Sequence, residues 1–209
     1  MFTGLIEAIG EIRELQRSGD AGTVRIVAAF AGELAMGESV AVDGMCLTVT
    51  DKSQAEFTAQ ISGESFKRST IGGKHIGESV NLERAMLATS RLGGHLVLGH
   101  VDGVGELTER TEQGETAVLR FRYPGADAAL LVEKGSIAVD GISLTIAGLE
   151  GDTFTMAVIP TTLQGTTLGG MKPGRQVNLE YDVIGKYVVR ALELQKGDIT
   201  PEKLADWGY

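Results

Sequence analysis

The sequence contains little cysteine and no long apolar run, and each scarcity excludes a class of protein. Cys46 is the single cysteine among 209 residues, so no disulfide can form within the chain. No apolar run approaches the roughly 20 residues that a membrane-spanning helix needs. The first residues also lack the basic and apolar segments of a secretory signal. We therefore expect a cytoplasmic protein with no membrane partner.

Basic residues are also in the minority. The chain has 19 Lys and Arg against 28 Asp and Glu, and its formal net charge is −9. The basic residues are scattered along the sequence, whereas binding to nucleic acid depends on clustered Lys and Arg. We expect no nucleic-acid partner, and instead a small molecule or another copy of the same chain.

By contrast, glycine is abundant, with 29 residues, and much of the sequence occurs twice. The segment VDGMCLTV at 42–49 recurs as VDGISLTI at 139–146, and VNLE at 80–83 recurs at 177–180, each 97 positions later. Such a fixed offset indicates an internal duplication. It predicts two domains, residues 1–95 and 96–182, each large enough to bury a core. The repeats differ in one chemically reactive side chain, because the thiol of Cys46 in the first repeat corresponds to the hydroxyl of Ser143 in the second.

Short β-rich runs lie between the glycine-containing turns. In the first repeat we expect strands at 5–15, 23–27, 37–42, 47–50, 56–61 and 79–83, with a helical turn at 64–69. About six short strands per repeat, separated by turns, are typical of a small antiparallel barrel.

The end of the chain has a helical pattern instead. Apolar residues recur at helical spacing from Ile184 to Leu192, which predicts a helix over 183–195 that stops at Gly197. A second, short helical turn is expected at 202–206. The apolar face of the longer helix either packs on a neighbouring subunit or covers a barrel of its own chain, and periodicity does not separate these alternatives.

Few residues suggest chemistry by spacing alone. Cys46 is either a small buried side chain or a functional thiol beside a turn. The histidines, His75, His95 and His100, have no metal-ligand spacing with it, so we expect no metal site. No glycine-rich phosphate loop is present, so no nucleotide cofactor is expected either. Hydroxyl groups in both repeats suit a polyhydroxylated heterocycle, although threonine is also common in strands.

Four segments, in order, resemble the riboflavin synthase family. They are MFTGLIE at 1–7, GMCLTVT at 44–50, GGHLVLGH at 93–100 and DGISLT at 140–145. The resemblance covers nearly the whole chain. It implies an all-β fold of two tandem six-stranded antiparallel Greek-key barrels plus a C-terminal α-helix. The helical segment, residues 183–209, would then help to hold a homotrimer.

The resemblance also implies a dismutation that needs no cofactor and no metal. Two molecules of 6,7-dimethyl-8-ribityllumazine react, and one donates a four-carbon unit to the other. The products are riboflavin and 5-amino-6-(D-ribitylamino)uracil. The implied active site lies where the first barrel of one subunit meets the second barrel of its neighbour. Association with a lumazine synthase is left open.

The resemblance assigns one group of ligand contacts to each repeat. The first group is Gly4, Leu5, Ile6, Cys46, Leu47, Thr48, Gln60, Ile61, Ser62, Gly63, Glu64 and Ser65. The second group is Gly99, His100, Val101, Lys134, Ser143, Leu144, Thr145, Ile159, Pro160, Thr161, Thr162, Leu163 and Gln164.

Catalytic roles follow from the same resemblance. His100 and Thr145 are candidates for proton transfer, because the 7-methyl group of the lumazine is acidic. Cys46 and Ser143 are candidates to supply or position a nucleophile. Phe2 is a candidate to pack against a bound ring, and Asp182 is a further candidate of the site.

Two other readings compete with catalysis. A non-catalytic antenna protein can use the same double barrel to hold a fluorophore, but such proteins usually keep only one working site. Both repeats here retain the pattern Asp-Gly-x-x-Leu-Thr. A flavin reductase of similar barrel type is disfavoured because the chain has no nicotinamide-binding domain.

Overall fold

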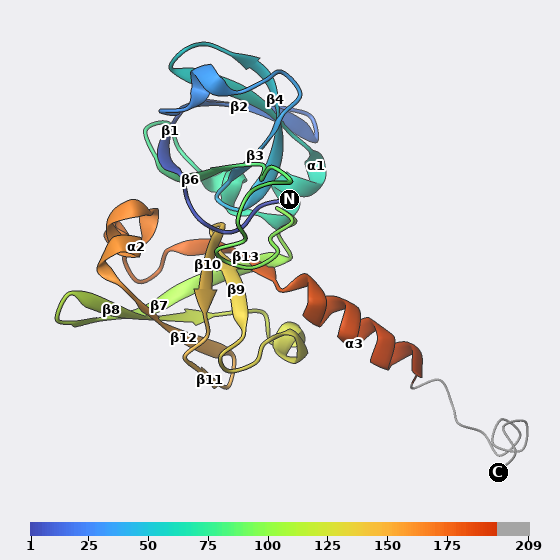
Figure 1. Ribbon diagram of the computed structural model, residues 1–209, viewed down its shortest axis with the longest axis vertical. Helices are drawn as coiled ribbons and strands as arrows, with labels where there is room; N and C mark the ends of the chain where they lie inside the picture. Colours follow the sequence, from blue (N-terminus) through green and yellow to red (C-terminus); the bar gives the residue numbers. More distant parts are fainter. Residues whose placement is uncertain (196–209) are drawn as a thin grey trace, which may run out of the picture.

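The computed structural model describes residues 1–195, which form two β-rich units and a C-terminal helix (Figure 1). The first unit contains β1 (Ala8–Ser18), β2 (Ala21–Val27), η1 (Ala31–Glu33), β3 (Ser39–Val42), β4 (Met45–Lys52), β5 (Glu56–Ile61), α1 (Gly63–Arg68), η2 (Thr70–Gly73) and β6 (Ser79–Arg84). The second unit contains β7 (Gly103–Gln113), β8 (Thr116–Arg122), η3 (Gly125–Leu130), β9 (Ser136–Val139), β10 (Ile142–Thr145), β11 (Gly148–Glu150), β12 (Thr153–Val158), α2 (Pro160–Gly165), η4 (Thr167–Gly170) and β13 (Gln176–Tyr181). α3 (Val183–Gln195) follows.

The first unit is the closed six-stranded antiparallel barrel that the sequence predicts. Its strand order is β1-β2-β5-β4-β3-β6. Buried apolar side chains, such as Ile26 and Leu82, fill the interior. A Cβ on Gly10 would lie 2.5 Å from the Leu82 side chain, so glycine lets β1 pack closely on this core. The strand expected at 5–15 begins only at Ala8, because the residues before it run towards the second unit.

The second unit is an open seven-stranded sheet, in the order β10-β9-β13-β7-β8-β12-β11. In the first unit, β4 pairs with β5 through a bulge at Thr50. The equivalent strand of the second unit is interrupted after Thr145 and resumes at Gly148, so β10 and β11 replace one strand. The sheet therefore stays open between β10 and β12, which is where the expected second barrel would close.

The two units contact each other through reciprocal asparagines. Asn81 donates its side-chain amide to the carbonyl of Asp140 (3.0 Å), and Asn178 donates to the carbonyl of Asp43 (2.8 Å). Gly141 approaches the equivalent Gly44 so closely that a Cβ on Gly44 would lie 2.7 Å from the Gly141 nitrogen. Equivalent residues thus face each other across an approximate two-fold relation between the repeats.

The boundary predicted between residues 95 and 96 falls in the segment 85–102, which connects β6 to β7. This segment has no strand, apart from a single bridge between Phe2 and Val97. Each unit has its own buried apolar cluster, one on either side of this connection.

α3 confirms the predicted helix and projects away from both units (Figure 1). Its apolar residues are largely exposed, including Ile184 (61%), Tyr187 (75%) and Leu192 (53%). Lys186 anchors the first turn through an ion pair with Asp102 at 2.5 Å. The projecting helix therefore does not bury this face on a barrel of its own chain. Gly197 and the turn at 202–206 lie outside the described residues.

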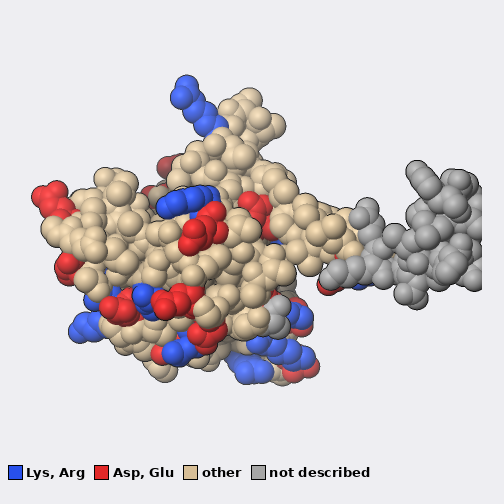
Figure 2. All heavy atoms as spheres, turned by 90° about the horizontal axis from the view of Figure 1, so that it is seen from below, with Lys and Arg blue, Asp and Glu red and all other residues tan. Residues whose placement is uncertain are grey.

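The surface charges are mixed rather than separated. Figure 2 shows Lys and Arg lying beside Asp and Glu on the face it presents. Arg120, for example, contacts both Glu109 (3.3 Å) and Glu150 (3.1 Å). Among residues 1–195, no helix is long and apolar enough to cross a membrane.

Candidate active site

Each repeat contributes a glycine-containing segment that packs on the other repeat. The carbonyl of Gly4 accepts the N–H of Ser143 (2.8 Å), and the carbonyl of Gly99 accepts the N–H of Cys46 (2.9 Å). Both glycines are left-handed, with φ of +77° and +80°. A Cβ on either would lie 2.5 Å from the Cβ of its partner, Ser143 or Cys46. Glycine is therefore required at both positions.

This exchange of segments, in which each repeat packs a segment on the other, extends into the apolar cores. Ile6 packs against the core of the second unit, whereas Val101 packs against the core of the first. The two segments run antiparallel at the junction between the repeats, where Phe2 pairs with Val97. The grouping from the sequence, in which each segment lies at the pocket of its own repeat, is therefore wrong.

Buried carboxylates hold the two exchanged segments in place. Glu83 accepts the N–H groups of Thr3 (2.6 Å) and Gly4 (2.9 Å). Its equivalent, Glu180, accepts three successive N–H groups, those of Leu98 (2.7 Å), Gly99 (2.9 Å) and His100 (3.0 Å). Burial raises the pKa of both carboxyl groups, and the N–H groups oppose that effect. Successive N–H groups around one anion form a rigid backbone nest.

The first pocket has a volume of about 340 Å³ and lies on the first unit. It is lined by Met45, Cys46, Ser62, Glu64, Ser65, Arg68, Gly99, His100, Val101 and Asp102. Cys46 is half-buried at the pocket, and His100 is exposed. Ser62 caps α1 by accepting the N–H of Ser65 (3.1 Å). A thiol, two hydroxyl groups and an imidazole therefore face one cavity.

The second site is the equivalent region around Ser143. The hydroxyl of Ser143 lies 2.7 Å from Nδ1 of His95, and the backbone N–H of His95 donates to the carbonyl of Thr3 (3.1 Å). Thr145 is exposed on the same side of β10, two residues further on. The segment 159–164 enters α2, with Pro160 in its first turn.

His95 and Asp182 belong to the surroundings of this second site. Burial lowers the pKa of His95, and the nearby carboxylate of Asp182 partly opposes the shift. Asp182 also caps α3, because its side chain accepts the N–H of Ile184 (2.9 Å). The imidazole is therefore neutral at neutral pH and can accept a proton.

Some predicted site residues lie elsewhere. Phe2 is fully buried between the repeats, beside Val97, so within this chain it does not pack against a ligand ring as expected. Leu47 and Ile61 point into the first core, since they alternate with the outward residues of their strands. Lys134 lies in an exposed turn before β9, and its ligand contact stays a prediction.

The remaining residues are consistent in position with the two sites. Thr48 and Gln60 form an exposed cross-strand pair on the outer face that also carries Cys46. Leu144 and Leu163 pack against the second core, near the outward residues of β10 and α2.

His95, Glu83 and Glu180 also hold the two sites in place, although they are not among the site residues predicted from the sequence. The two glutamates end the repeated VNLE motif, and their recurrence was the available signal. Nothing in the sequence links His95 to Ser143, because the contact joins residues 48 positions apart.

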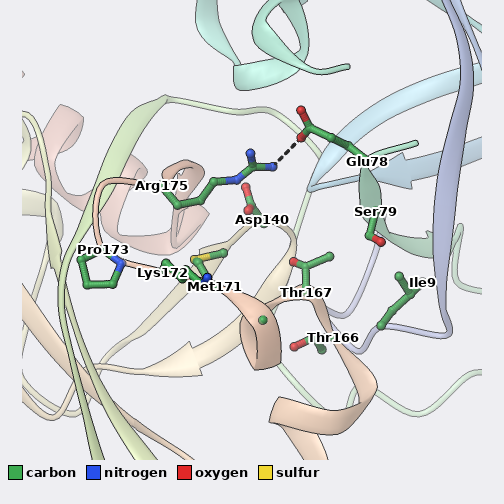
Figure 3. A pocket seen from close by; sticks show the side chains of 11 residues that line it. Ile9, Glu78, Ser79, Asp140, Thr166, Thr167, Met171, Lys172, Pro173 and Arg175 are labelled. Carbon is green, nitrogen blue, oxygen red and sulfur yellow. Dashed lines mark hydrogen bonds and ion pairs between the residues drawn. The ribbon is translucent and has the colours of Figure 1, made fainter. Parts of the chain in front are cut away.

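A further cavity, of about 670 Å³, lies between the two units and shares no residue with either site (Figure 3). Asp140 and Met171 line it, and Arg175 crosses it to pair with Glu78 (2.9 Å). Glu78 and Arg175 occupy equivalent positions in the repeats, so this region is an inter-repeat contact.

Comparisons with known proteins first give the class. The model of the family described as lumazine binding domain matches twice, at residues 3–85 and 98–182. The chain is thus a tandem lumazine-binding-domain protein. It is 41% identical to riboflavin synthase of Actinobacillus pleuropneumoniae, over 95% of this chain and 93% of that protein. It is 46% identical to riboflavin synthase of Mycobacterium tuberculosis strain H37Rv, over 92% and 98%. The chain belongs to the riboflavin synthase family, which is a family of enzymes, and the resemblance inferred from the sequence is confirmed.

Solved structures give the same fold at lower identity. LumP complexed with riboflavin has a TM-score of 0.80 and 24% identity, over 87% of this chain and 99% of that one. LumP complexed with 6,7-dimethyl-8-(1'-D-ribityl) lumazine has a TM-score of 0.78 and 24% identity, over 86% and 98%. At this identity the similarity concerns the fold alone.

Proposed function

We propose that this protein catalyses the dismutation of two molecules of 6,7-dimethyl-8-ribityllumazine to riboflavin and 5-amino-6-(D-ribitylamino)uracil. The observation that carries the proposal is the pair of equivalent sites around Cys46 and Ser143, in a chain whose relatives are named riboflavin synthase. A reaction between two identical molecules in unlike roles suits two sites of similar shape and different chemistry. Holding both molecules in register replaces a bimolecular encounter.

The groups around each site suit this chemistry. Hydroxyl groups can bind the ribityl chain and the ring carbonyls, and the glycines leave room for a flat ring to approach the backbone. The four-carbon transfer requires removal of a proton from the 7-methyl group of one lumazine. His100 in the first pocket, and Ser143 and Thr145 at the second site, are the candidate participants.

We further infer a homotrimer in which α3 makes part of the contact. The exposed Ile184, Tyr187 and Leu192 support an apolar partner for this helix, since such a stripe is seldom left in water. The complete active site would then combine the first unit of one subunit with the second unit of its neighbour. Deletion of residues 183–209 should leave folded β units that sediment as monomers. An intact trimer after this deletion would exclude α3 from the assembly.

The direct test is turnover with the lumazine as the sole substrate. Riboflavin and the uracil product should appear in equal amounts, with two lumazines consumed for each riboflavin, as measured by chromatography. The fold similarity to the LumP complexes favours a second candidate, a binding protein without turnover. Tight binding of the lumazine with no riboflavin formed would establish that alternative. The cytoplasmic location and an association with lumazine synthase stay predictions, which fractionation and co-sedimentation can test.

A further inference from the structure

Ser143 has a partner that its equivalent, Cys46, lacks. Nδ1 of His95 lies 2.7 Å from the Ser143 hydroxyl. Among residues 1–195, no side chain lies within hydrogen-bond distance of the Cys46 thiol, although His100 lines the same pocket. Among the described residues, therefore, only the second site has a histidine hydrogen-bonded to the side chain at this turn.

The His95 imidazole is fixed by its surroundings. The side chain is buried, its backbone N–H donates to Thr3, and its Nε2 is buried with no partner among the described residues. The preceding Gly94 allows this approach, because a Cβ there would lie 2.8 Å from the Ser143 Cβ. A buried nitrogen without a hydrogen-bond partner is energetically unfavourable. The chain therefore tolerates an unsatisfied polar group beside the hydroxyl, which is frequent where a group has a chemical task.

We propose that His95 accepts the hydroxyl proton of Ser143 while Ser143 removes a proton from a lumazine bound at the second site. The proposal rests on the proposed function. The C–H bond of the 7-methyl group breaks and an O–H bond forms at Ser143, while the original hydroxyl proton moves to Nδ1 of His95. The products of this step are the delocalised lumazine anion and an imidazolium, so atoms and charge balance. His95 acts through Ser143 and is a positioning residue in this scheme.

The electrostatics of the second site agree with this direction of transfer. Burial lowers the pKa of His95 and keeps the imidazole neutral before the step, and in the tautomer that carries its proton on Nε2 the Nδ1 atom is free to accept. The carboxylate of Asp182, at the start of α3, opposes the shift and stabilises the imidazolium once it forms. Ser143 and Thr3, which contact His95 through hydrogen bonds, are uncharged.

The test separates the proton step from the overall reaction. The full-length protein is incubated with 6,7-dimethyl-8-ribityllumazine in D₂O, and loss of the 7-methyl proton signal is followed by NMR above the protein-free background. Riboflavin formation is measured in parallel over pH 5 to 9. The variants are H95N, which can keep a hydrogen bond to Ser143 but cannot take the proton, S143A, and H95N/S143A. The control is H75N, at an exposed turn outside both sites.

We expect H95N to lower both the exchange rate and kcat by about 100-fold, which is within the usual range for general base catalysis. KM and the ligand fluorescence titration should change by less than about threefold. The acid limb of the pH profile should disappear in H95N, and H95N/S143A should be no slower than S143A within about threefold. H75N should match the parent.

Two results would overturn the proton transfer from Ser143 to His95. The first is a methyl-proton exchange rate and a kcat of H95N within about threefold of the parent. The second is independent losses that multiply in H95N/S143A. If H95N does not fold, S143A decides, because unchanged methyl exchange in S143A also excludes this proton transfer. A parent protein that exchanges the methyl protons but forms no riboflavin would contradict the proposed function and leave the proton transfer supported.

Discussion

The two repeats place the same aspartate at the same turn but give it different neighbours. Asp43 and Asp140 each accept the N–H of an asparagine 38 positions later, both at 2.7 Å. Asp43 also forms a buried ion pair with Lys74 at 2.5 Å. The position equivalent to Lys74 is Met171, so among residues 1–195 Asp140 has no such ion pair. The hydrogen bond from the asparagine holds the turn in both repeats, whereas the ion pair with lysine is formed by Asp43 and not by Asp140 among the described residues.

The pKa of Asp140 reflects the absence of a lysine at position 171. Burial, together with the neighbouring Asp43 carboxylate, raises the pKa of Asp140 to about 8, and Lys74 opposes the shift from across the interface. Met171 lines the cavity of about 670 Å³ between the units (Figure 3). Lys74 lines the equivalent cavity of about 380 Å³. The replacement of lysine by methionine thus leaves Asp140 with a raised pKa and without the ammonium partner that Asp43 has.

The largest effect is expected when the first repeat is made to resemble the second. Lys74→Met removes the buried ammonium and leaves Asp43 without its ion pair. Breaking a buried pair in this way should lower the free energy of unfolding by about 3–5 kcal/mol. Urea denaturation of the variant and of the control Met171→Leu would measure it. A loss below about 1 kcal/mol for Lys74→Met would mean that the two turns are energetically alike.

A smaller effect is expected at the exchanged segments. Gly99→Ala places a methyl group at a left-handed φ and against Cys46, so it should destabilise the protein by about 2–3 kcal/mol and disrupt the first pocket. Gly114→Ala is the matched control, since Gly114 has φ of +64° but nothing within 4 Å of a new Cβ. Equal destabilisation of the two variants would show that backbone strain alone, without the contact to Cys46, explains glycine at this position.

A change in pH should distinguish the two aspartates. The folded-state pKa of Asp140 is raised above its unfolded value, so its stabilising contribution is complete below about pH 4 and is lost as the pH rises towards 8. Met171→Lys supplies the missing ammonium and should stabilise the protein by about 1 kcal/mol at pH 8, with a smaller gain at pH 5. The difference in unfolding free energy between variant and parent, measured at both values, tests this.

A gain that does not depend on pH would show that the lysine introduced by Met171→Lys acts through packing rather than through Asp140. Asp140→Asn is the second variant, because its neutral amide should remove the contribution of this residue to the pH dependence.

The sequence predicted what depends on local pattern. Turn residues such as Asp43-Gly44 and the alternation of 23–27 predicted the strands of the first barrel, and the fixed offset predicted most of the equivalent strands in the second repeat. The helix over 183–195 followed from apolar spacing. The interruption after Thr145 was not predicted, because a repeat argument assumes equal strands, whereas Ala147 and Gly148 replace Thr50 and Asp51 at the bulge.

The exchange of segments could not be read from the sequence for a different reason. Gly4 and Gly99 look alike, and the pattern around each is compatible with packing on either repeat. Only the three-dimensional relation between the units decides that Gly4 contacts Ser143 and that Gly99 contacts Cys46. The pairing of His95 with Ser143 is a consequence of the same exchange.

The smallest effect on stability is expected at the one chemical difference between the equivalent site residues. Cys46→Ser gives the first site the hydroxyl that the second already has, and Ser143 shows that a hydroxyl fits beside this turn. The free energy of unfolding should change by less than about 1 kcal/mol, because Cys46 is only half-buried. Binding of the lumazine should persist, while kcat should fall by about tenfold, equivalent to about 1.4 kcal/mol in the activation free energy.

The reciprocal change, Ser143→Cys, should be more harmful to kcat, because a thiol is a poorer hydrogen-bond partner for His95. Steady-state kinetics of both variants and of the double exchange would compare the sites directly. If the two sites were interchangeable, the double exchange would restore the parent kcat. We expect it to remain slow, because His95 stays beside residue 143 and, among the described residues, no histidine is hydrogen-bonded to the side chain at residue 46.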